Sequence, residues 1–318
     1  MTARYAVGVD VGGTAIKTVL ADAAGRALLQ REDPTPRGVE PLLEAVRQLV
    51  AEVEAAVAAG TVADGPEPVR PEQVVPTVGV DVPGIVDEST GTAVLSVNLG
   101  WQDVPMARLL SEALGRPVSL GHDVRSGAWA EARWGAGSSS CMYLALGTGV
   151  AAVFIIDGRP VVSGGWAGEV GQALVPDPDR PGRLERFEAV ASAGALARRL
   201  AATREPGRRQ EVEAAGALGV QIAMEAGDRE AQRVWDTALD AQAEVIARSV
   251  CMLGPLDVVI GGGLMKAGRR LLFEPLTERV SRLLTVSPVP RVVPAALGAW
   301  AQALGSAGRA LESQEQPR

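Results

Sequence analysis

The sequence predicts an α/β protein made of two similar lobes with a ligand cleft between them. A strand, a glycine corner and a second strand occur at Tyr5–Asp22, and the same arrangement returns at Cys141–Asp157. Between the two hairpins, strand and helix patterns alternate in the order βββαβαβ, which is expected of one α/β layer. A supersecondary unit that occurs twice indicates an internally duplicated fold. We therefore expect each half to bring one glycine-cornered hairpin to a nucleotide site.

The first hairpin carries residues suited to phosphate groups. The strand Tyr5–Val9 ends in Asp10, and the corner Gly12–Gly13 leads to a second strand that leaves from Thr14. Glycines permit a positive φ and let backbone N–H groups approach a ligand closely. A hydroxyl from Thr14 and an ammonium from Lys17 favour phosphate binding, and Asp10 could hold Mg²⁺ through water. The alternative is an ordinary hairpin whose polar residues only cap the turn, because short glycine motifs often match by chance.

The elements expected in the rest of the first half follow from periodicity and from glycine and proline punctuation. They are a third strand (Arg26–Glu32), a long amphipathic helix (Gly38–Ala59), a surface loop (Gly60–Pro71), a buried strand (Val74–Val82) ending in Pro83-Gly84, a loop with Asn98–Trp101, a helix (Pro105–Leu114) and a short strand (Pro117–Leu120).

The second half begins at His122-Asp123, directly before a helical run. The expected elements are a helix (Val124–Trp134), the second hairpin with the corner Gly147-Thr148-Gly149, a glycine-rich loop (Ser163–Gln172), an irregular segment (Ala173–Gly182), a helical region (Arg186–Gly254), a strand (Asp257–Ile260) followed by Gly261-Gly262-Gly263, a helix from Lys266, a small-residue helix (Ala295–Ala307) and a frayed tail (Glu312–Arg318). We expect domains at residues 1–122 and 123–294, with residues 295–318 returning to the first.

Composition narrows the class of protein. The 318 residues carry a net charge of −7, which argues against a nucleic-acid-binding surface. Cys141 and Cys251 are far apart in apolar surroundings, so we expect buried free thiols and not a disulfide. No leader and no apolar run of membrane-spanning length is evident. We expect a cytoplasmic protein without a membrane partner and without a DNA-binding segment ahead of the first strand.

The ordered motifs together resemble the ROK family of bacterial sugar kinases over nearly the whole chain. Asp10-Val11-Gly12-Gly13-Thr14 resembles the first phosphate motif of that family, Leu146-Gly147-Thr148-Gly149 the second and Gly261-Gly262-Gly263 the adenosine motif. Pro83-Gly84 and Asn98-Leu99-Gly100-Trp101 resemble its sugar-side loops, and Gly168-Glu169-Val170-Gly171 its sugar-binding signature. Asp123 stands where the family has its catalytic aspartate, and Glu188 matches its second sugar-binding glutamate.

This resemblance implies a fold and a reaction. The fold is the duplicated actin-like, ribonuclease-H-like fold of the hexokinase superfamily. The reaction is phosphoryl transfer from ATP with Mg²⁺ to a sugar hydroxyl, most simply O6, with Asp123 as general base. The alternative role for Asp123 is a helix N-cap, which is compatible with a base because one oxygen suffices for capping. The family commonly forms homodimers, and the small-residue helices here permit one.

Two departures from the family pattern concern the sugar side. Gln172 replaces the histidine of the family's structural zinc site, and Ala173–Arg186 contains no cysteine. The resemblance implies that loss of this histidine also changes the C1 and C2 side of the sugar. Because a closed zinc site needs four N or S ligands, we expect no zinc. His122 stands where the family usually has an asparagine that reads hydroxyls around C3 and C4. It is either a packing spacer or a sign of altered selectivity, for example toward an amino sugar such as kanosamine, whose ammonium Glu169 could pair.

Three readings of the function stay open at this point. The first is an ATP-dependent kinase for a hexose or modified hexose, including a plain glucokinase. The second uses inorganic polyphosphate as the donor, although no long basic track is evident. The third is a non-catalytic sugar sensor, against which Asp10, Asp123 and the intact glycine corners argue.

Overall fold

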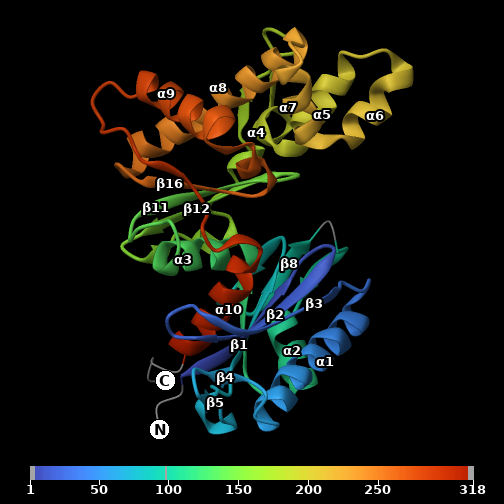
Figure 1. Cartoon of the computed structure of the whole chain (residues 1–318), viewed down its shortest axis with the longest axis vertical. Coiled ribbons are helices and arrows are strands. Elements are labelled where there is room, and N and C mark those ends of the chain that lie inside the picture. Colours follow the sequence, from blue (N-terminus) through green and yellow to red (C-terminus); the bar gives the residue numbers. More distant parts are fainter. Residues whose placement is uncertain (1–3, 97–98, 314–318) are drawn as a thin grey trace. The chain divides into compact units, whose positions relative to one another are not determined.

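The computed structural model describes residues 4–96 and 99–313. The chain divides into two compact units. The N-terminal unit comprises Met1–Gly135, Val162–Trp166 and Leu297–Arg318, and the central unit comprises Ala136–Val161 and Ala167–Ala296. Each unit is built on one five-stranded sheet, and Figure 1 labels the elements of both. The two units are described separately.

The N-terminal unit has the strand order β10-β6-β1-β2-β3. Its strands are β1 (Tyr5–Val11), β2 (Ala15–Asp22), β3 (Ala27–Pro34), β6 (Val78–Val82) and β10 (Val118–His122). The pairs β1–β2 and β2–β3 are antiparallel, whereas β1–β6 and β6–β10 are parallel. Its helices are α1 (Val39–Ala58), α2 (Met106–Leu114), α3 (Asp123–Trp134) and α10 (Ala301–Glu312).

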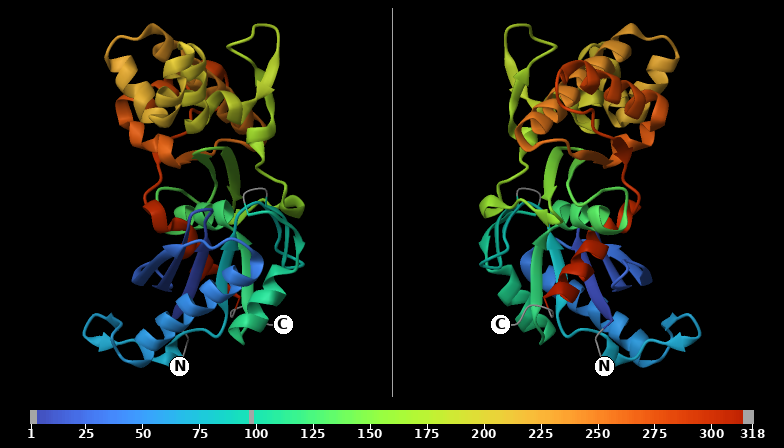
Figure 2. Two further views of the ribbon diagram at one scale, coloured as in Figure 1. Left: turned by 90° about the vertical axis from the view of Figure 1, so that its right-hand side faces the viewer. Right: turned by 90° about the vertical axis from the view of Figure 1, so that its left-hand side faces the viewer.

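The helices α1 and α10 cover opposite faces of this sheet (Figure 2). Val7 and Val9 of β1 pack in the core that contains α1, whereas Ala6 packs in the core that contains α10. Successive residues of a strand point to opposite faces, so the alternation along β1 assigns one helix to each face. In α1 the buried apolar residues recur every three or four positions, which is the pattern of a helix with one buried face.

Two glycines let α10 lie unusually close to the sheet. Gly8 of β1 and Gly79 of β6 are register partners. A Cβ at Gly8 would collide with the backbone of Ala303, and one at Gly79 would collide with the backbone of Ser306. A larger residue at either position would therefore push α10 away from β1 and β6.

Smaller sheets complete the N-terminal unit. The strands β7 (Ile85–Asp87), β8 (Thr92–Ser96) and β9 (Trp101–Val104) form a three-stranded sheet. The strands β4 (Ala63–Asp64) and β5 (Glu67–Pro68) pair within the segment expected to be a surface loop, and the 3-10 helix η1 (Pro71–Gln73) follows. The hairpin is only six residues long, with the sequence Ala-Asp-Gly-Pro-Glu-Pro. A periodicity search over a longer window does not detect so short an element.

The central unit has the strand order β13-β12-β11-β16-β17. Its strands are β11 (Cys141–Leu146), β12 (Val150–Ile156), β13 (Arg159–Pro160), β16 (Asp257–Gly261) and β17 (Val292–Pro294), and β14 (Leu174–Pro176) pairs with β15 (Leu184–Arg186) in a separate hairpin. The α-helices are α4 (Phe187–Ala191), α5 (Ala193–Ala202), α6 (Arg209–Ala214), α7 (Gly216–Glu225), α8 (Arg229–Leu253) and α9 (Glu274–Leu283).

The two sheets have the same topology. In each, a strand pairs antiparallel with both its hairpin neighbours, and two parallel pairings follow on the other side. The predicted duplication is therefore confirmed at the level of strand order and direction, and not only by the two corners.

In the helical region expected after Arg186, α4 and α5 are separated at Ser192, which has an extended ψ and caps α5 through Ala195 N. Two other expectations for individual residues or elements were wrong. The helix expected from Lys266 begins as a 3-10 turn, η5 (Gly263–Ala267), and a π-helical turn, η6 (Arg269–Phe273), before α9. Cys141 is buried, but Cys251 is exposed near the end of α8. No helix within residues 4–96 and 99–313 is long and apolar enough to cross a membrane.

The division into units also differs from the expected boundary after residue 122. Helix α3 belongs to the N-terminal unit because it packs against α10. Gly305 of α10 lies against the backbone of Ser126 in α3, and Gly308 lies against the ring of Trp129. The small residues of the C-terminal helix thus hold α3 in the unit from which β10 emerges.

Candidate active site

Three aspartates converge at one edge of the N-terminal sheet. Asp10 of β1 and Asp81 of β6 are register partners, so their side chains share the face toward α10. The next parallel strand, β10, ends in His122 and leads directly into Asp123, the first residue of α3. The carboxyl ends of neighbouring parallel strands meet at one edge of a sheet, and in open α/β sheets such an edge commonly binds ligands.

Asp10 is a buried acid among acids. Its residue is 8% exposed, and burial raises its pKa well above the ordinary value. The carboxylates of Asp123 and Asp81 raise the pKa further, whereas Lys17 lowers it. The ammonium of Lys17 donates to the carbonyl of Ala299 at 2.9 Å, which leaves two of its three N–H donors for a ligand. A carboxylate in these surroundings is stabilised by a cation.

Asp81 is the one of the three aspartates that was not predicted from the sequence. It is fully buried, and its Oδ1 accepts from Ser126 Oγ at 2.8 Å and from Arg309 Nη2 at 2.5 Å. Arg309 also donates to Ser126 Oγ, which closes a triangle between β6, α3 and α10. Burial raises the pKa of Asp81 to about 7, although Arg309 and Ser126 both act to lower it. The triangle holds α3 one turn beyond Asp123.

His122 caps α3 and contacts the candidate base. Its Nδ1 accepts from Arg125 N at 3.2 Å, so His122 and not Asp123 is the N-cap. Burial lowers the pKa of His122, and the neutral ring then carries its proton on Nε2, as assigned from the bond at Nδ1. Nε2 lies 3.5 Å from Asp123 Oδ1. Both ring nitrogens therefore have partners within the unit, and a sugar hydroxyl would compete with Asp123 for Nε2.

The carboxylate of Asp123 is oriented through one oxygen. Its Oδ1 also accepts from Val124 N at 2.7 Å, and the side chain is 23% exposed. The position expected to be a helix cap is instead the first helical residue, because His122 takes the capping role. The second oxygen, Oδ2, has no hydrogen bond to any residue that the structure describes, so it can accept a proton from a ligand.

A second missed residue, Arg125, ties α3 to the small sheet. Its guanidinium is 4% exposed and donates to Glu88 Oε1 at 3.0 Å and to the carbonyls of Val86 and Gly165 at 3.0 and 3.3 Å. Glu88 in turn accepts from His122 N at 3.3 Å. A buried guanidinium with three different acceptors fixes the orientation of the helix start.

The first glycine corner is open to solvent and has no side chains at Gly12 and Gly13, as predicted. None of Gly12, Gly13, Gly147 and Gly149 has a positive φ, so these corners do not use the left-handed backbone that glycine permits. A Cβ at Gly12 would lie 2.8 Å from Ala15 O, and at Gly13 it would meet nothing within 4 Å. The corner is braced from below, because Thr35 Oγ1 donates to Gly12 O at 2.7 Å.

The remaining predicted residues of this unit lie at the start of the small sheet. Pro83 and Gly84 turn the chain from β6 into β7, and Gly84 has a φ of 104° with the carbonyl of Leu95 directly against it. Glycine at this position therefore has a backbone reason. Thr14, at the first corner, is exposed. Asn98 lies outside the described residues.

In the central unit the second corner and the triple glycine come together. Gly261 pairs with Ala145 in the parallel register of β16 and β11, and a Cβ at Gly262 would lie 2.6 Å from the carbonyl carbon of Leu146. Thr148 is exposed at the corner. A Cβ at Gly194, in the first turn of α5, would lie 3.1 Å from Thr148 O. The positive end of a helix dipole beside a bare corner favours an anion.

Three side chains gather next to this corner. Glu188 Oε1 accepts from Gln172 Nε2 at 3.2 Å and lies 3.1 Å from Arg186 Nη1. Its other oxygen, Oε2, is 3.2 Å from the point that a Cβ on Gly149 would occupy. Glu169 precedes the 3-10 helix η3 (Val170–Gln172), which is the turn that carries Gln172. The predicted sugar-side residues Gln172 and Glu188 are thus in contact, and Arg186 was missed.

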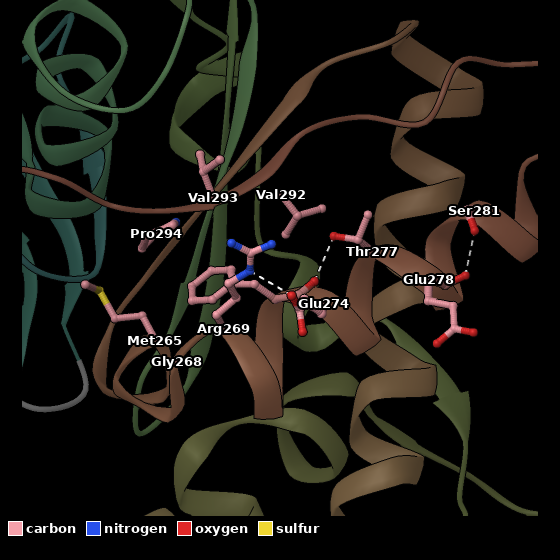
Figure 3. Close-up of a pocket in the computed structure, with 11 residues that line it drawn as sticks. Met265, Gly268, Arg269, Glu274, Thr277, Glu278, Ser281, Val292, Val293 and Pro294 are labelled. Carbon is pink, nitrogen blue, oxygen red and sulfur yellow. Dashed lines mark hydrogen bonds and ion pairs between the residues drawn. The ribbon is translucent and has the colours of Figure 1, made fainter.

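A pocket of about 800 Å³ lies elsewhere in the central unit, between η5, η6, α9 and β17 (Figure 3). None of the predicted site residues lines it. Arg269 Nε donates to Glu274 Oε1 at 2.7 Å, and the hydroxyl of Thr277 donates to the carbonyl of Phe273. These polar side chains are already paired, and the rest of the lining is largely apolar. The pocket therefore does not look like a catalytic site.

Comparison with known proteins gives a consistent result. The sequence profile of the ROK family matches residues 6–312. A glucokinase of Thermotoga maritima is 30% identical over an alignment of 291 positions, and the match covers 86% of each chain. The crystal structure of a ROK hexokinase from Thermus thermophilus superposes with a TM-score of 0.79 and 31% identity, covering 98% of this chain and 100% of that one. A ROK family glucokinase from Streptomyces griseus, solved with glucose and AMPPNP, has a TM-score of 0.74 and 26% identity over 97% and 99% of the two chains.

The chain has two glycine corners and an acidic sheet edge on a duplicated α/β fold, and that fold is shared with these structures. The class defined is a sugar kinase with the actin-like fold of the hexokinase superfamily. The chain belongs to the ROK family. The fold class and the family expected from the ordered motifs are therefore confirmed.

Proposed function

We propose that the protein transfers the γ-phosphoryl group of ATP to the 6-hydroxyl of a hexose or modified hexose, with Asp123 as the general base. The observation that carries this proposal is the state of the Asp123 carboxylate. Oδ1 is held by Val124 N and faces His122 Nε2, so the orientation of the group is set before substrate arrives. A positioned base near the reacting hydroxyl typically contributes a factor of about 10² to 10⁴ in rate.

The chemical step balances with this one base. The sugar oxygen forms a bond to the γ-phosphorus while the bond from phosphorus to the bridging oxygen of ADP breaks. The hydroxyl proton passes to Asp123 Oδ2, and ADP leaves with the electron pair. Catalysis of such a transfer depends mainly on positioning and on offsetting the phosphate charge.

The donor side uses the two corners and the adenosine motif. The first corner (Gly12, Gly13, Thr14) with Lys17 and the second corner (Gly147, Thr148, Gly149) offer backbone and hydroxyl donors to phosphates, and Gly261, Gly262 and Gly263 leave room for the nucleoside. Asp10 fits a hydrated Mg²⁺ because it is a buried carboxylate whose acidic neighbours favour a cation. Bound Mg²⁺ would offset the charge on the β- and γ-phosphates.

The sugar side is proposed to use Glu169, Gln172 and Glu188 of the central unit and Pro83, Gly84, Asn98, His122 and Asp123 of the N-terminal unit. The contact of Gln172 with Glu188 supports this assignment for those two residues. We propose an amino sugar, kanosamine being one candidate, because His122 and Gln172 both depart from the usual pattern. A clear preference for plain glucose over kanosamine, glucosamine, mannose and N-acetylmannosamine in kcat/KM would remove this part of the proposal.

Replacement of Asp123 by Asn tests the reaction itself. The change keeps the shape of the side chain at the start of α3 but removes the base, so turnover should fall at least about 10²-fold. The melting temperature and the affinity for an ATP analogue should stay near those of the unchanged protein. Appreciable turnover by the variant with any sugar would reject Asp123 as the base. If the unchanged protein phosphorylated none of the sugars, a sugar sensor would be favoured.

Further parts of the proposal concern metal, donor and assembly. We propose that the protein holds no structural zinc, is cytoplasmic and forms a homodimer, and that ATP is preferred to inorganic polyphosphate. The segment after Gln172 has another source of stiffness, because the buried Arg199 binds Asp179 at 2.6 Å and Asp179 also pairs with Arg233 at 2.8 Å. One zinc per chain in metal analysis of the purified protein would contradict the absence of zinc.

A further inference from the structure

One oxygen of the Glu188 carboxylate is engaged by two neighbours. Arg186 Nη1 lies 3.1 Å from Oε1, and Gln172 Nε2 donates to the same oxygen at 3.2 Å. Arg186 Nη1 also donates to Gln172 Oε1 at 3.5 Å. The three side chains therefore form a closed group in which the positive charge of Arg186 is shared between Glu188 and Gln172.

The backbone holds Arg186 in this place. Arg186 ends β15 and pairs with Leu174 of β14, and it is also the N-cap residue of α4, whose second residue is Glu188. Its backbone N–H donates to Glu185 Oε1 at 2.9 Å. The side chain is 54% exposed and that of Glu188 is 24% exposed, so the ion pair stands at the surface of the unit, open to a ligand.

We propose that Arg186 determines which substituent of the sugar can bind next to Glu188. With Arg186 present, the site accepts a neutral hydroxyl at this position and rejects an ammonium. This inference rests on the proposed function, in which Glu188 is a sugar ligand. The oxygen that remains for a ligand is Oε2, on the side of Gly149. A hydroxyl can donate to Oε2 whether or not Arg186 is present, because its bond depends on the acceptor and not on the net charge.

An ammonium at the same place is affected differently. With Arg186 beside it, the Glu188 carboxylate is part of a pair of zero net charge, and the guanidinium repels a second cation a few ångströms away. Partial exposure screens this repulsion, so we expect an effect of about tenfold in affinity. The resemblance places Gln172 on the C1 and C2 side of the sugar, so the ammonium rejected is the one at C2. An amino group elsewhere on the ring, such as one that meets Glu169, is not subject to this restriction.

The test compares one charged and one uncharged substituent at C2 in matched variants. Arg186→Met removes the charge and keeps much of the length, Arg186→Lys keeps the charge, and Arg183→Met removes a charge from the same hairpin. The Arg183 guanidinium has no hydrogen bond or ion pair with any residue in the described ranges, which makes it the matched control. The quantity measured is the ratio of glucosamine to glucose, which carry an ammonium and a hydroxyl at C2, both in kcat/KM and in binding affinity by calorimetry.

We expect this ratio to rise about tenfold in Arg186→Met, to stay within about twofold in Arg186→Lys and Arg183→Met, and to fall back as salt is added. An unchanged ratio in Arg186→Met, an equal gain for glucose, or no binding of either sugar to any variant would overturn the inference. If the affinity ratio rose as expected in Arg186→Met but no sugar was phosphorylated, the result would instead count against the proposed reaction. The two hypotheses can therefore fail separately.

Discussion

Replacing Asp81 by Asn should flatten the pH dependence of stability of the N-terminal unit. Asp81 is fully buried between Arg309 and Ser126, and it is nearly isosteric with Asn. Burial outweighs the two hydrogen-bond donors and raises the pKa of Asp81 from 3.8 to about 7. The other charged groups that face it are Asp10 and Asp123, and both oppose its ionisation.

The sign of the effect follows from proton linkage. Because the pKa is higher in the folded state, the folded protein holds a proton between about pH 4 and pH 7 that the unfolded chain has released. The stabilisation is complete below the unfolded pKa and is lost as the pH rises through the folded pKa. The shift from 3.8 to about 7 spans roughly three pK units, or about 4 kcal/mol at 1.36 kcal/mol per unit. From about pH 5 to about pH 8 the loss is about 3 kcal/mol.

The assay is urea unfolding of the unchanged protein and of Asp81→Asn at about pH 5 and pH 8. Tryptophan fluorescence reports mainly on the N-terminal unit, since five of the six tryptophans fall within it. The stability of the variant relative to the unchanged protein should shift in favour of the variant by about 3 kcal/mol between the two pH values. A difference that does not change with pH would refute the reasoning. A shift in the opposite direction would show that the ion pair with Arg309 outweighs burial.

Three further changes test the packing and the corners. Gly79→Ala should cost about 1 to 3 kcal/mol in unfolding free energy, because its Cβ would meet the backbone of Ser306 under α10. Gly147→Ala should leave stability within about 0.5 kcal/mol, since nothing lies within 4 Å of its Cβ, while raising KM for ATP; a normal KM would remove this corner from the donor site. Arg199→Met should destabilise the protein by about 3 kcal/mol because it removes the buried guanidinium that donates to Asp179 Oδ2 and to the carbonyl of Val190, and a melting temperature unchanged within a degree would contradict that role.

Sequence patterns predicted the elements whose signals are local. The hairpin of Tyr5–Asp22 was found because residues of strand character stand on both sides of Gly12–Gly13, and the structure has mostly buried strands there. The helix α1 was found to within one residue at either end, since its apolar spacing continues over five turns. The duplication was inferred from two corners and is matched by the equal strand directions of the two sheets.

The side-chain partners were beyond reach because they join residues distant in sequence. Arg309 meets Asp81 across 228 positions, and Arg125 meets Glu88 across 37. The capping role of His122 was missed for a related reason. A cap is recognised in a sequence from serine, threonine, aspartate or asparagine, and here a histidine Nδ1 takes that place one residue earlier than expected.

One signal for the missed acid was nevertheless present in the sequence. The pentapeptide Val-Gly-Val-Asp-Val occurs at residues 7–11 and again at residues 78–82. The structure pairs the two copies in parallel register, with glycine beside glycine and aspartate beside aspartate. In both copies the glycine admits α10 and the valines fill the opposite core.

The identical segments differ in what lies next to each aspartate. The guanidinium of Arg309 lies against Gly121 of β10, the register partner of Asp81, and donates to Asp81. One copy of the motif therefore binds a guanidinium of the same unit, and the other is the proposed site for Mg²⁺. The same five residues thus give a structural acid in β6 and a candidate metal-binding acid in β1. The difference comes from a single arginine on the last helix.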